Sequence, residues 1–171
     1  MARKYYETKV VGVGGDVQKF IKVVKMIVLF DDSMVLPELR EFSILHSGNK
    51  LNEAVKVGDI IKIADEEFKI IKVGSEVYSN MCTLGHVVIK FDGGAGDLME
   101  SSIHVEDKPI PDIKIGDTIS IKDTTADILM DKKIYIDGAD NETVIAMKKI
   151  FLDNGAILTD KDDSDIIVTV K

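Results

Sequence analysis

Residues 60–73 read IIKIADEEFKIIKV, and this stretch decides the fold class. Apolar and polar side chains alternate on both sides of a short acidic segment, which is typical of two β-strands with one buried face. Asp65, Glu66 and Glu67 join the two halves, so the stretch predicts a β-hairpin. The segments around this hairpin show what kind of sheet contains it.

A tight-turn signal precedes the hairpin and occurs again farther along the chain. Residues 57–59 read VGD, and residues 115–117 read IGD before the strand-like residues 118–122. The two stretches indicate the same device used twice, a tight turn that leads into a strand. Two copies of three residues do not by themselves establish an internal repeat.

Many short strands are predicted up to residue 122, and helical patterns are scarce. The strand-like runs are separated by Gly, Asp and Pro, and they cover residues 4–13, 25–30, 39–46, 60–73, 84–93, 101–107 and 118–122. Short strands at this spacing are typical of a closed barrel or a small sandwich. The predicted fold class for residues 1–122 is therefore mainly β.

The last part of the chain, residues 123–171, differs in charge and in pattern. It holds 11 Asp or Glu and 6 Lys, a local net charge of −5, against −3 for residues 1–122. The run KIYID at 133–137 predicts a strand, a helix over 142–153 follows a cap at Asp140 or Asn141, and two short strands complete a β-α-β-β appendage.

Fewer than 50 residues bury too little surface for a secure core alone. We therefore expect two domains, 1–122 and 123–171, with the C-terminal extension docked on the barrel or on a second chain.

The composition excludes several classes of partner and site. A net charge of −8 and a pI near 4.9 argue against nucleic acid or an anionic membrane surface, and are compatible with a basic protein partner. The single cysteine, Cys82, allows no disulfide within the chain, which fits a reducing cytosol, and we expect it to be a buried structural thiol. No apolar run is long enough for a transmembrane helix, and the first ten residues do not form a signal peptide.

Three histidines lie at the edges of predicted strands: His46, His86 and His104. Zinc binding is weakly supported, because the gaps of 40 and 18 residues carry no ligand pattern and no Cys pair accompanies them. A Ser-His-Asp hydrolase is also weakly supported, since Ser47 is adjacent to His46 in the chain instead of facing it across a fold.

A third possibility is a histidine that carries a phosphoryl group, because a neutral imidazole nitrogen is nucleophilic near pH 7. Backbone N–H groups of Ser47 and Gly48 offer donors to its oxygens, and a second histidine offers support. The plain alternative is that His46 ends a strand, hydrogen-bonded and inert.

Three pieces of the sequence carry a resemblance to a known family: ILHSGNKL (44–51), VGS (73–75) with N-x-x-x-LGHVVIKFDG (80–93), and IHVEDKPIPDIKIGDTISI (103–121). They occur in order and with similar gaps over about two thirds of the chain, and LGH-x-x-x-x-FDG is fairly specific. The run from about Tyr5 to Lys122 resembles the glucitol/sorbitol-specific enzyme IIA component of the bacterial phosphoenolpyruvate-dependent sugar phosphotransferase system.

The resemblance implies a closed, Greek-key-like β-barrel and a phosphotransferase that works through a phosphohistidine at His46, without a metal or a cofactor. It implies that the phosphoryl group comes from the phosphocarrier protein HPr and passes to a cysteine of the enzyme IIB component of a sorbitol transporter with IIB and IIC components. A cytoplasmic location without membrane insertion follows from this role.

The sequence departs from the family pattern after the active histidine, where Ser47 and Gly48 stand in place of a further His or Cys, and at Ser101, which replaces a Gly. We expect His86 to support the phosphohistidine and His104 to be structural. The extension at 123–171 motivates an alternative function, a non-catalytic regulatory or binding module on the same barrel.

Overall fold

The computed structural model of the chain describes residues 2–48, 51–125, 132–138 and 141–170. The chain divides into two compact units, one of which is Lys4–Asp123, while residues from Thr124 onward fall in the other. Each unit has its own hydrophobic core. None of the helices in these ranges is long and apolar enough to cross a membrane.

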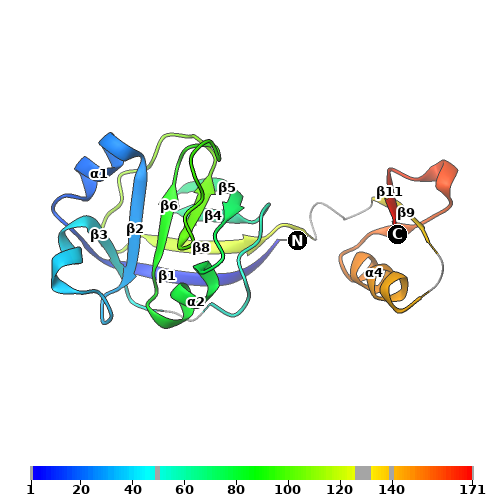
Figure 1. Cartoon of the computed structure of the whole chain (residues 1–171), viewed down its shortest axis with the longest axis horizontal. Coiled ribbons are helices and arrows are strands. Elements are labelled where there is room, and N and C mark those ends of the chain that lie inside the picture. The colour runs from blue at the N-terminus through cyan, green and yellow to red at the C-terminus, as the bar shows by residue number, and fades with distance from the viewer. Residues whose placement is uncertain (1, 49–50, 126–131, 139–140, 171) are drawn as a thin grey trace. The chain divides into compact units, whose positions relative to one another are not determined.

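Eight strands of the first unit close into a barrel (Figure 1), in the order β1-β3-β2-β6-β7-β5-β4-β8. They are β1 (Arg3–Val13), β2 (Met26–Asp31), β3 (Ser43–His46), β4 (Ile60–Ile63), β5 (Glu66–Val73), β6 (Val87–Lys90), β7 (Ser102–Val105) and β8 (Thr118–Asp123). The connections contain the helices α1 (Val17–Val24) and α2 (Val77–Thr83) and the 3-10 helix η1 (Pro37–Phe42). The predicted mainly β fold and closed barrel are confirmed.

The barrel interior is filled by the apolar half of each alternating strand. Its fully buried side chains are mostly branched aliphatics, with two aromatic rings, Phe68 and Phe91, that meet edge to face at a centroid distance of 4.9 Å. Branched side chains suit the pleated inner surface of a barrel. The buried apolar residues of the alternating pattern in residues 60–73 are therefore those whose side chains point into the barrel.

The hairpin at residues 60–73 is confirmed, but its turn is shorter than expected. Glu66 and Glu67 pair with Ile63 and Lys62, so they belong to β5 and not to the connection. Only two residues separate the strands, and Ala64 adopts a positive φ of 52°. Glu67 is exposed on the outer face, so its acidic side chain stays in contact with water and folding does not desolvate its charge.

The barrel contains an internal repeat that relates β1-α1-β2-β3 to β5-α2-β6-β7. β1 pairs with β3 across a bulge between Val10 and Gly12, and β5 pairs with β7 across a bulge between Ile70 and Lys72. β2 runs parallel to β3 as β6 does to β7. The two halves meet where β2 and β6 pair antiparallel, in a register symmetric about the pair Val28 and Val88.

The two turns noted in the sequence belong to this repeat. The Gly58 N–H donates to the Ile70 carbonyl at 2.9 Å, and the Gly116 N–H donates to the Val10 carbonyl at 2.8 Å. Both glycines have positive φ, 96° and 100°, a conformation that side chains rarely adopt. The Gly58 turn, which precedes β4, therefore binds to β5, and the Gly116 turn, which precedes β8, binds to β1. Each turn thus contacts the first strand of one half of the repeat.

In each half of the barrel, the glycine that follows the first strand packs directly against the backbone of another segment. The Gly14 N–H donates to the Ser43 carbonyl at 2.9 Å, and the Gly74 N–H donates to the Ser102 carbonyl at 2.8 Å. A Cβ atom added at either glycine lies 2.3 Å from a backbone carbonyl oxygen. Only glycine fits this approach without displacing the neighbouring chain.

The prediction of a strand over residues 39–46 is wrong in its first half. Pro37–Phe42 form the 3-10 helix η1, and the strand is limited to Ser43–His46. Leu39 and Phe42 are exposed. Proline at the first helical position favours this helix, and the Phe42 ring packs against Phe20 of α1 at 5.5 Å instead of entering the barrel.

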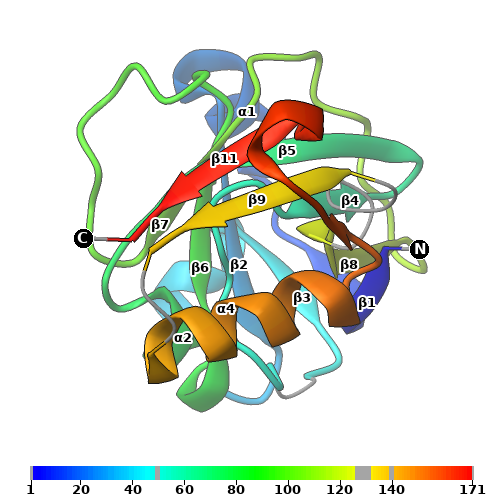
Figure 2. The same cartoon turned by 90° about the vertical axis from the view of Figure 1, so that its right-hand side faces the viewer.

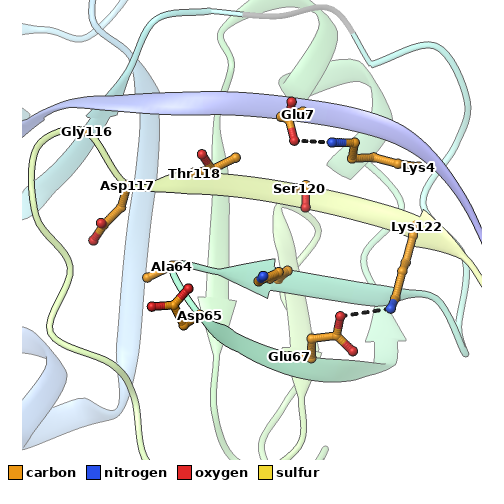
Figure 3. A pocket seen from close by; sticks show the side chains of 11 residues that line it. Lys4, Glu7, Ala64, Asp65, Glu67, Gly116, Asp117, Thr118, Ser120 and Lys122 are labelled. Atoms are coloured by element: carbon orange, nitrogen blue, oxygen red, sulfur yellow. Dashed lines mark hydrogen bonds and ion pairs between the residues drawn. The ribbon is translucent and has the colours of Figure 1, made fainter.

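A polar pocket lies on the outer surface of the barrel across β1, β8 and β4 (Figure 3). Its lining includes the ion pairs Lys4–Glu7 and Lys122–Glu67, the second with a distance of 2.8 Å between Nζ and Oε1. No histidine lines it. Because both signs of charge are paired in an exposed position, this pocket is a solvated outer face of the sheet.

The second unit confirms the predicted β-α-β-β order and adds a short 3-10 helix. Its elements are β9 (Lys133–Asp137), α4 (Glu142–Asp153), β10 (Ile157–Leu158), η2 (Lys161–Asp163) and β11 (Ile166–Thr169). Both outer strands run parallel to β9 in the order β10-β9-β11, and Figure 2 shows β9 beside β11 with α4 along the sheet.

The Asn141 side chain caps α4 by accepting from the Val144 N–H at 3.0 Å, while Asp140, the other expected cap, lies outside the described residues. Val144 is fully buried, and Met147 and Phe151 pack on the same core, as the helical periodicity predicts.

The close approach at Gly14 generates a stability test. Gly14→Ala should lower the free energy of unfolding by about 1–3 kcal/mol, because its Cβ meets fixed backbone. Gly15→Ala is the matched control, since its Cβ meets only the flexible end of Glu41, at 2.9 Å. Urea unfolding of both variants measures the difference, and equal destabilisation would contradict the packing described for Gly14.

Candidate functional site

The candidate site is built around His46, the last residue of β3. In the sheet His46 pairs with Val10 of β1 on one side and with Asp31 of β2 on the other. The strand is buried along its whole length, and the His46 side chain is 0% exposed. Gly48, two residues after His46, has a positive φ of 70°.

Both ring nitrogens of His46 are hydrogen-bonded. Nε2 lies 2.7 Å from the Gly85 carbonyl oxygen, and Nδ1 lies 3.1 Å from the Gly48 backbone nitrogen. A carbonyl only accepts and a backbone N–H only donates, so Nε2 carries the proton and Nδ1 carries the lone pair. The Thr8 hydroxyl of β1 lies 3.0 Å from Nδ1 and completes this environment.

Two glycines make this arrangement possible. A Cβ atom on Gly85 would lie 2.8 Å from Nε2 of His46, and Gly85 has a positive φ of 58°. A Cβ atom on Gly48 would lie 2.2 Å from Oδ2 of Asp31. The ring is therefore enclosed by backbone at both edges, with the Asp31 carboxylate beside Gly48.

Burial lowers the pKa of His46 below its ordinary value, although the hydrogen bond to Gly85 and the negative charge of Asp31 work to raise it. The pKa of Asp31 is also lowered. Partial burial works to raise it, but the hydrogen bonds from Ser33, and the positive charge that His46 bears when it is protonated in acid, outweigh that contribution. The imidazole is thus neutral at pH 7, with a carboxylate placed to stabilise positive charge if it develops.

A polar pocket of about 450 Å³ opens beside the imidazole. Asp31, Ser47, Gly48 and Gly85 line it, so both edges of the buried ring border the pocket through a glycine. Cys82 of α2 also lines this pocket. It is half-buried and packs against the barrel core, with Sγ 3.6 Å from the Leu51 carbonyl oxygen, so the expected buried thiol is only partly buried.

The backbone amides of Ser47 and Gly48, predicted as phosphate donors, are occupied in this conformation. The Ser47 N–H donates to the Lys9 carbonyl at 3.0 Å, and the Gly48 N–H donates to His46 itself. The Ser47 hydroxyl lies 3.5 Å from that of Thr8. Of the two amides, the Gly48 N–H is the one that points at the imidazole ring.

His86 lies next to the site through its chain neighbour, Gly85. Nδ1 of His86 donates to the Leu29 carbonyl at 3.0 Å, and its ring stacks on Phe30 at 4.1 Å. Burial lowers its pKa. Within the described residues no hydrogen bond joins the rings of His86 and His46, so any effect of His86 on His46 passes through the backbone at Gly85.

His104 is fully buried away from this site. Its Nδ1 lies 2.9 Å from Oδ1 of Asp92, and the same carboxylate accepts from the N–H groups of Gly94 and Gly96. The pair holds the glycine-rich loop after β6 against β7, which is a structural role. No group of three or more His, Cys, Asp or Glu that could hold a metal ion occurs in the part of the chain that the structure describes.

Three residues of the site were not identified from the sequence: Thr8, Asp31 and Gly85. Thr8 lies at an inward position of β1, in phase with the buried Tyr6 and Val10. Strand alternation places it inside, but nothing local indicates that His46 lies opposite. Asp31 is the last residue of β2, and Gly85 lies just before β6. Only the pairing of β2 with β3 and β6 brings these two residues to the imidazole.

The burial of His46 generates a pH prediction. Its pKa is lowered below 6.5, so the unfolded chain binds a proton at a higher pH than the folded chain does. The free energy of unfolding should therefore fall as the pH drops below about 6.5, by at most about 1.4 kcal/mol per pH unit for this group. His86, whose pKa is also lowered, adds a contribution of the same sign.

NMR titration of the His46 ring should give a midpoint below 6.5, and urea unfolding of His46→Gln should show a weaker loss of stability in acid. A ring that titrates at or above 6.5 would contradict the buried, neutral imidazole.

Comparison with known proteins places this chain in a family. The family model described as "PTS system glucitol/sorbitol-specific IIA component" matches residues 5–120. The glucitol/sorbitol-specific EIIA component of the phosphotransferase system from Escherichia coli (strain K12) is 29% identical over 75 residues, which are 44% of this chain and 60% of that protein. The Shigella flexneri protein of the same name matches with the same values. The match thus spans less than two thirds of these relatives.

A solved structure agrees with the family match. The crystal structure of the PTS system IIA component from Enterococcus faecalis V583 superposes with a TM-score of 0.59 and 27% sequence identity, covering 67% of this chain and 97% of that chain. The family model covers well over half of the chain and includes most of β1, all of β2 to β7 and the first half of β8. The chain therefore belongs to the glucitol/sorbitol-specific IIA component family of the sugar phosphotransferase system.

Proposed function

We propose that this protein is a phosphocarrier that accepts a phosphoryl group on His46 and passes it to another component of the phosphotransferase system. The observation that carries the proposal is the state of the imidazole. It is neutral, held in one tautomer by two backbone groups and bordered by a pocket. Family membership supports the same role.

The donor in this proposal is phospho-HPr, and the acceptor is the IIB component of a glucitol/sorbitol transporter with its IIC partner. A phosphoryl group that moves from one imidazole nitrogen to another passes through a loose transition state, so positioning and charge stabilisation supply most of the catalysis. No metal or cofactor is required, because the phosphoramidate donor is already activated. The reaction belongs in the cytoplasm, where these partners meet.

Access to His46 requires a local change, because its side chain is 0% exposed. Ser47 and Gly48 cover Nδ1 and line the pocket, and Gly48 tolerates several backbone conformations. Displacing Ser47 and Gly48 opens the ring to the pocket and frees the Gly48 N–H for a phosphoryl oxygen. The energetic cost is one hydrogen bond, which the phosphoryl group replaces.

His86 has a supporting role in this proposal. It borders the Gly85 carbonyl, which binds Nε2 of His46, and its own ring is fixed by Leu29 and Phe30. Replacing His86 relaxes that segment without removing the phosphoacceptor.

A regulatory or binding module is the second candidate function. Two observations favour it: the complete burial of His46, and the second unit, which lies beyond the matched residues 5–120. Such a module binds a partner without turnover, and the extension sets its specificity.

A phosphorylation assay separates the two functions. Incubation with labelled phosphoenolpyruvate, enzyme I and HPr should give acid-labile label on the native chain, none on His46→Gln, and slower labelling on His86→Gln by about tenfold. His46→Gln and His86→Gln are matched substitutions of the same size, and circular dichroism checks their folds. Absence of label on the folded native chain would reject the phosphocarrier and favour the regulatory module.

A further inference from the structure

We propose that a second pocket of the barrel, distinct from the pocket beside His46, binds a small phosphomonoester. This second pocket has a volume of about 400 Å³ and lies between the end of α1 and the segment that follows β7. No residue lines both pockets, so the inference goes beyond the proposed function and does not depend on it. We call it the lysine pocket, because its lining includes three lysines, one carboxylate and two isoleucines: Lys22, Lys25, Lys108, Asp107, Ile21 and Ile110.

The internal repeat of the barrel explains why a second pocket occurs at this place. The Asp31 N–H at the end of β2 donates to the Leu84 carbonyl at 3.2 Å, and the Phe91 N–H after β6 donates to the Lys25 carbonyl at 3.0 Å. The second strand of each half therefore ends against the segment that follows the helix of the other half. The pocket beside His46 lies at the first of these contacts and the lysine pocket lies at the second. The lysine pocket is thus the repeat-related counterpart of the pocket beside His46.

The two pockets carry different side chains on the same framework. Lys25 and Gly85 each lie between a helix and the following strand, and both have positive φ, 50° and 58°. Glycine is the usual residue for this conformation, because a Cβ atom is disfavoured there. At Gly85 the absence of a side chain leaves room for the His46 ring, whereas Lys25 brings an ammonium group to the edge of its pocket. The lysine pocket therefore presents cations where its counterpart presents an imidazole.

The charges around the lysine pocket leave an excess of cations. Lys25 Nζ lies 2.8 Å from Oδ1 of Asp107, and Lys108 Nζ lies 2.6 Å from Oε2 of Glu106. The hydrogen bonds from Lys108 and from the Lys69 backbone N–H lower the pKa of Glu106, and the charges of both lysines act in the same direction. Within the described ranges of the chain, the Lys22 ammonium has no hydrogen-bond or ion-pair partner.

Four ammonium groups thus face two carboxylates, in a protein whose net charge is −8. The carboxyl end of α1 adds roughly half a negative charge, which does not cancel the excess.

A phosphomonoester matches both the charge and the shape of this pocket. It carries close to two negative charges at pH 7 and offers three acceptor oxygens. Each lysine ammonium has three donors on a flexible stem, so Lys22, Lys25 and Lys108 can converge on one phosphate group. Ile21 and Ile110 are partly buried against the barrel core and give the pocket an apolar wall for the carbon atoms of the ligand. Because inorganic phosphate cannot use that wall, we expect the ester to bind more tightly.

NMR titration of the full, ¹⁵N-labelled chain at pH 7 tests the site. The probe is glucose 6-phosphate, with inorganic phosphate and glucose as comparisons. Saturable shifts of the Lys22, Lys25 and Lys108 amide signals are expected, with tighter binding of glucose 6-phosphate than of phosphate and none of glucose. Absence of saturation at these amides, or shifts confined to Ser47 and Gly48 beside His46, would overturn the proposal. Equal affinity for phosphate and the ester would show an adventitious ion only and would also overturn it.

The unpaired lysine gives the sharpest pair of variants. Lys22→Gln should weaken binding of glucose 6-phosphate by about tenfold, the effect of losing one charge-assisted hydrogen bond, and Lys22→Arg should restore most of it. Lys19→Gln is the matched control, because Lys19 lies on the same helix but pairs with Asp16 and does not line the lysine pocket. Unchanged affinity in Lys22→Gln, or an equal loss in Lys19→Gln, would contradict the proposed contacts. Labelling of His46 does not enter this test, so its outcome is separate from that of the phosphorylation assay.

Discussion

The hydrogen bond from Nε2 of His46 to the Gly85 carbonyl, 2.7 Å long, is the interaction on which the candidate chemistry depends. It places the proton on one nitrogen and leaves the lone pair on the other. It forms because Gly85 adopts a positive φ and carries no side chain, so its carbonyl reaches the edge of the ring. A buried imidazole held in this way is neutral and fixed in one tautomer.

The barrel provides that geometry in only one of its two halves. The internal repeat places Val105 of β7 where β3 has His46, since the pair Val10–His46 corresponds to the pair Ile70–Val105. Val105 is part of the hydrophobic core, while His46 is surrounded by polar groups. The same backbone framework therefore holds packed apolar side chains in one half and the candidate site in the other, and the difference lies in a few side chains.

Much of the fold follows from local patterns, and most of the site does not. Alternation in residues 60–73 and the caps of α4 act over a few residues, so the sequence predicts them well. It fails at residues 39–42, where apolar side chains are exposed on a 3-10 helix, because burial depends on distant partners. His46 and its glycine turn are visible in the sequence. Thr8, Asp31 and Gly85 reach it only through strand pairing across the barrel.

The central claim is that His46 is held as a neutral imidazole with its proton on Nε2. A long-range ¹H–¹⁵N correlation spectrum of the free, ¹⁵N-histidine-labelled chain at pH 7 tests it directly, because the two tautomers give different patterns. The account predicts a single Nε2–H tautomer for His46, with an unprotonated Nδ1. A proton on Nδ1, or an averaged pattern typical of a free imidazole, would contradict it.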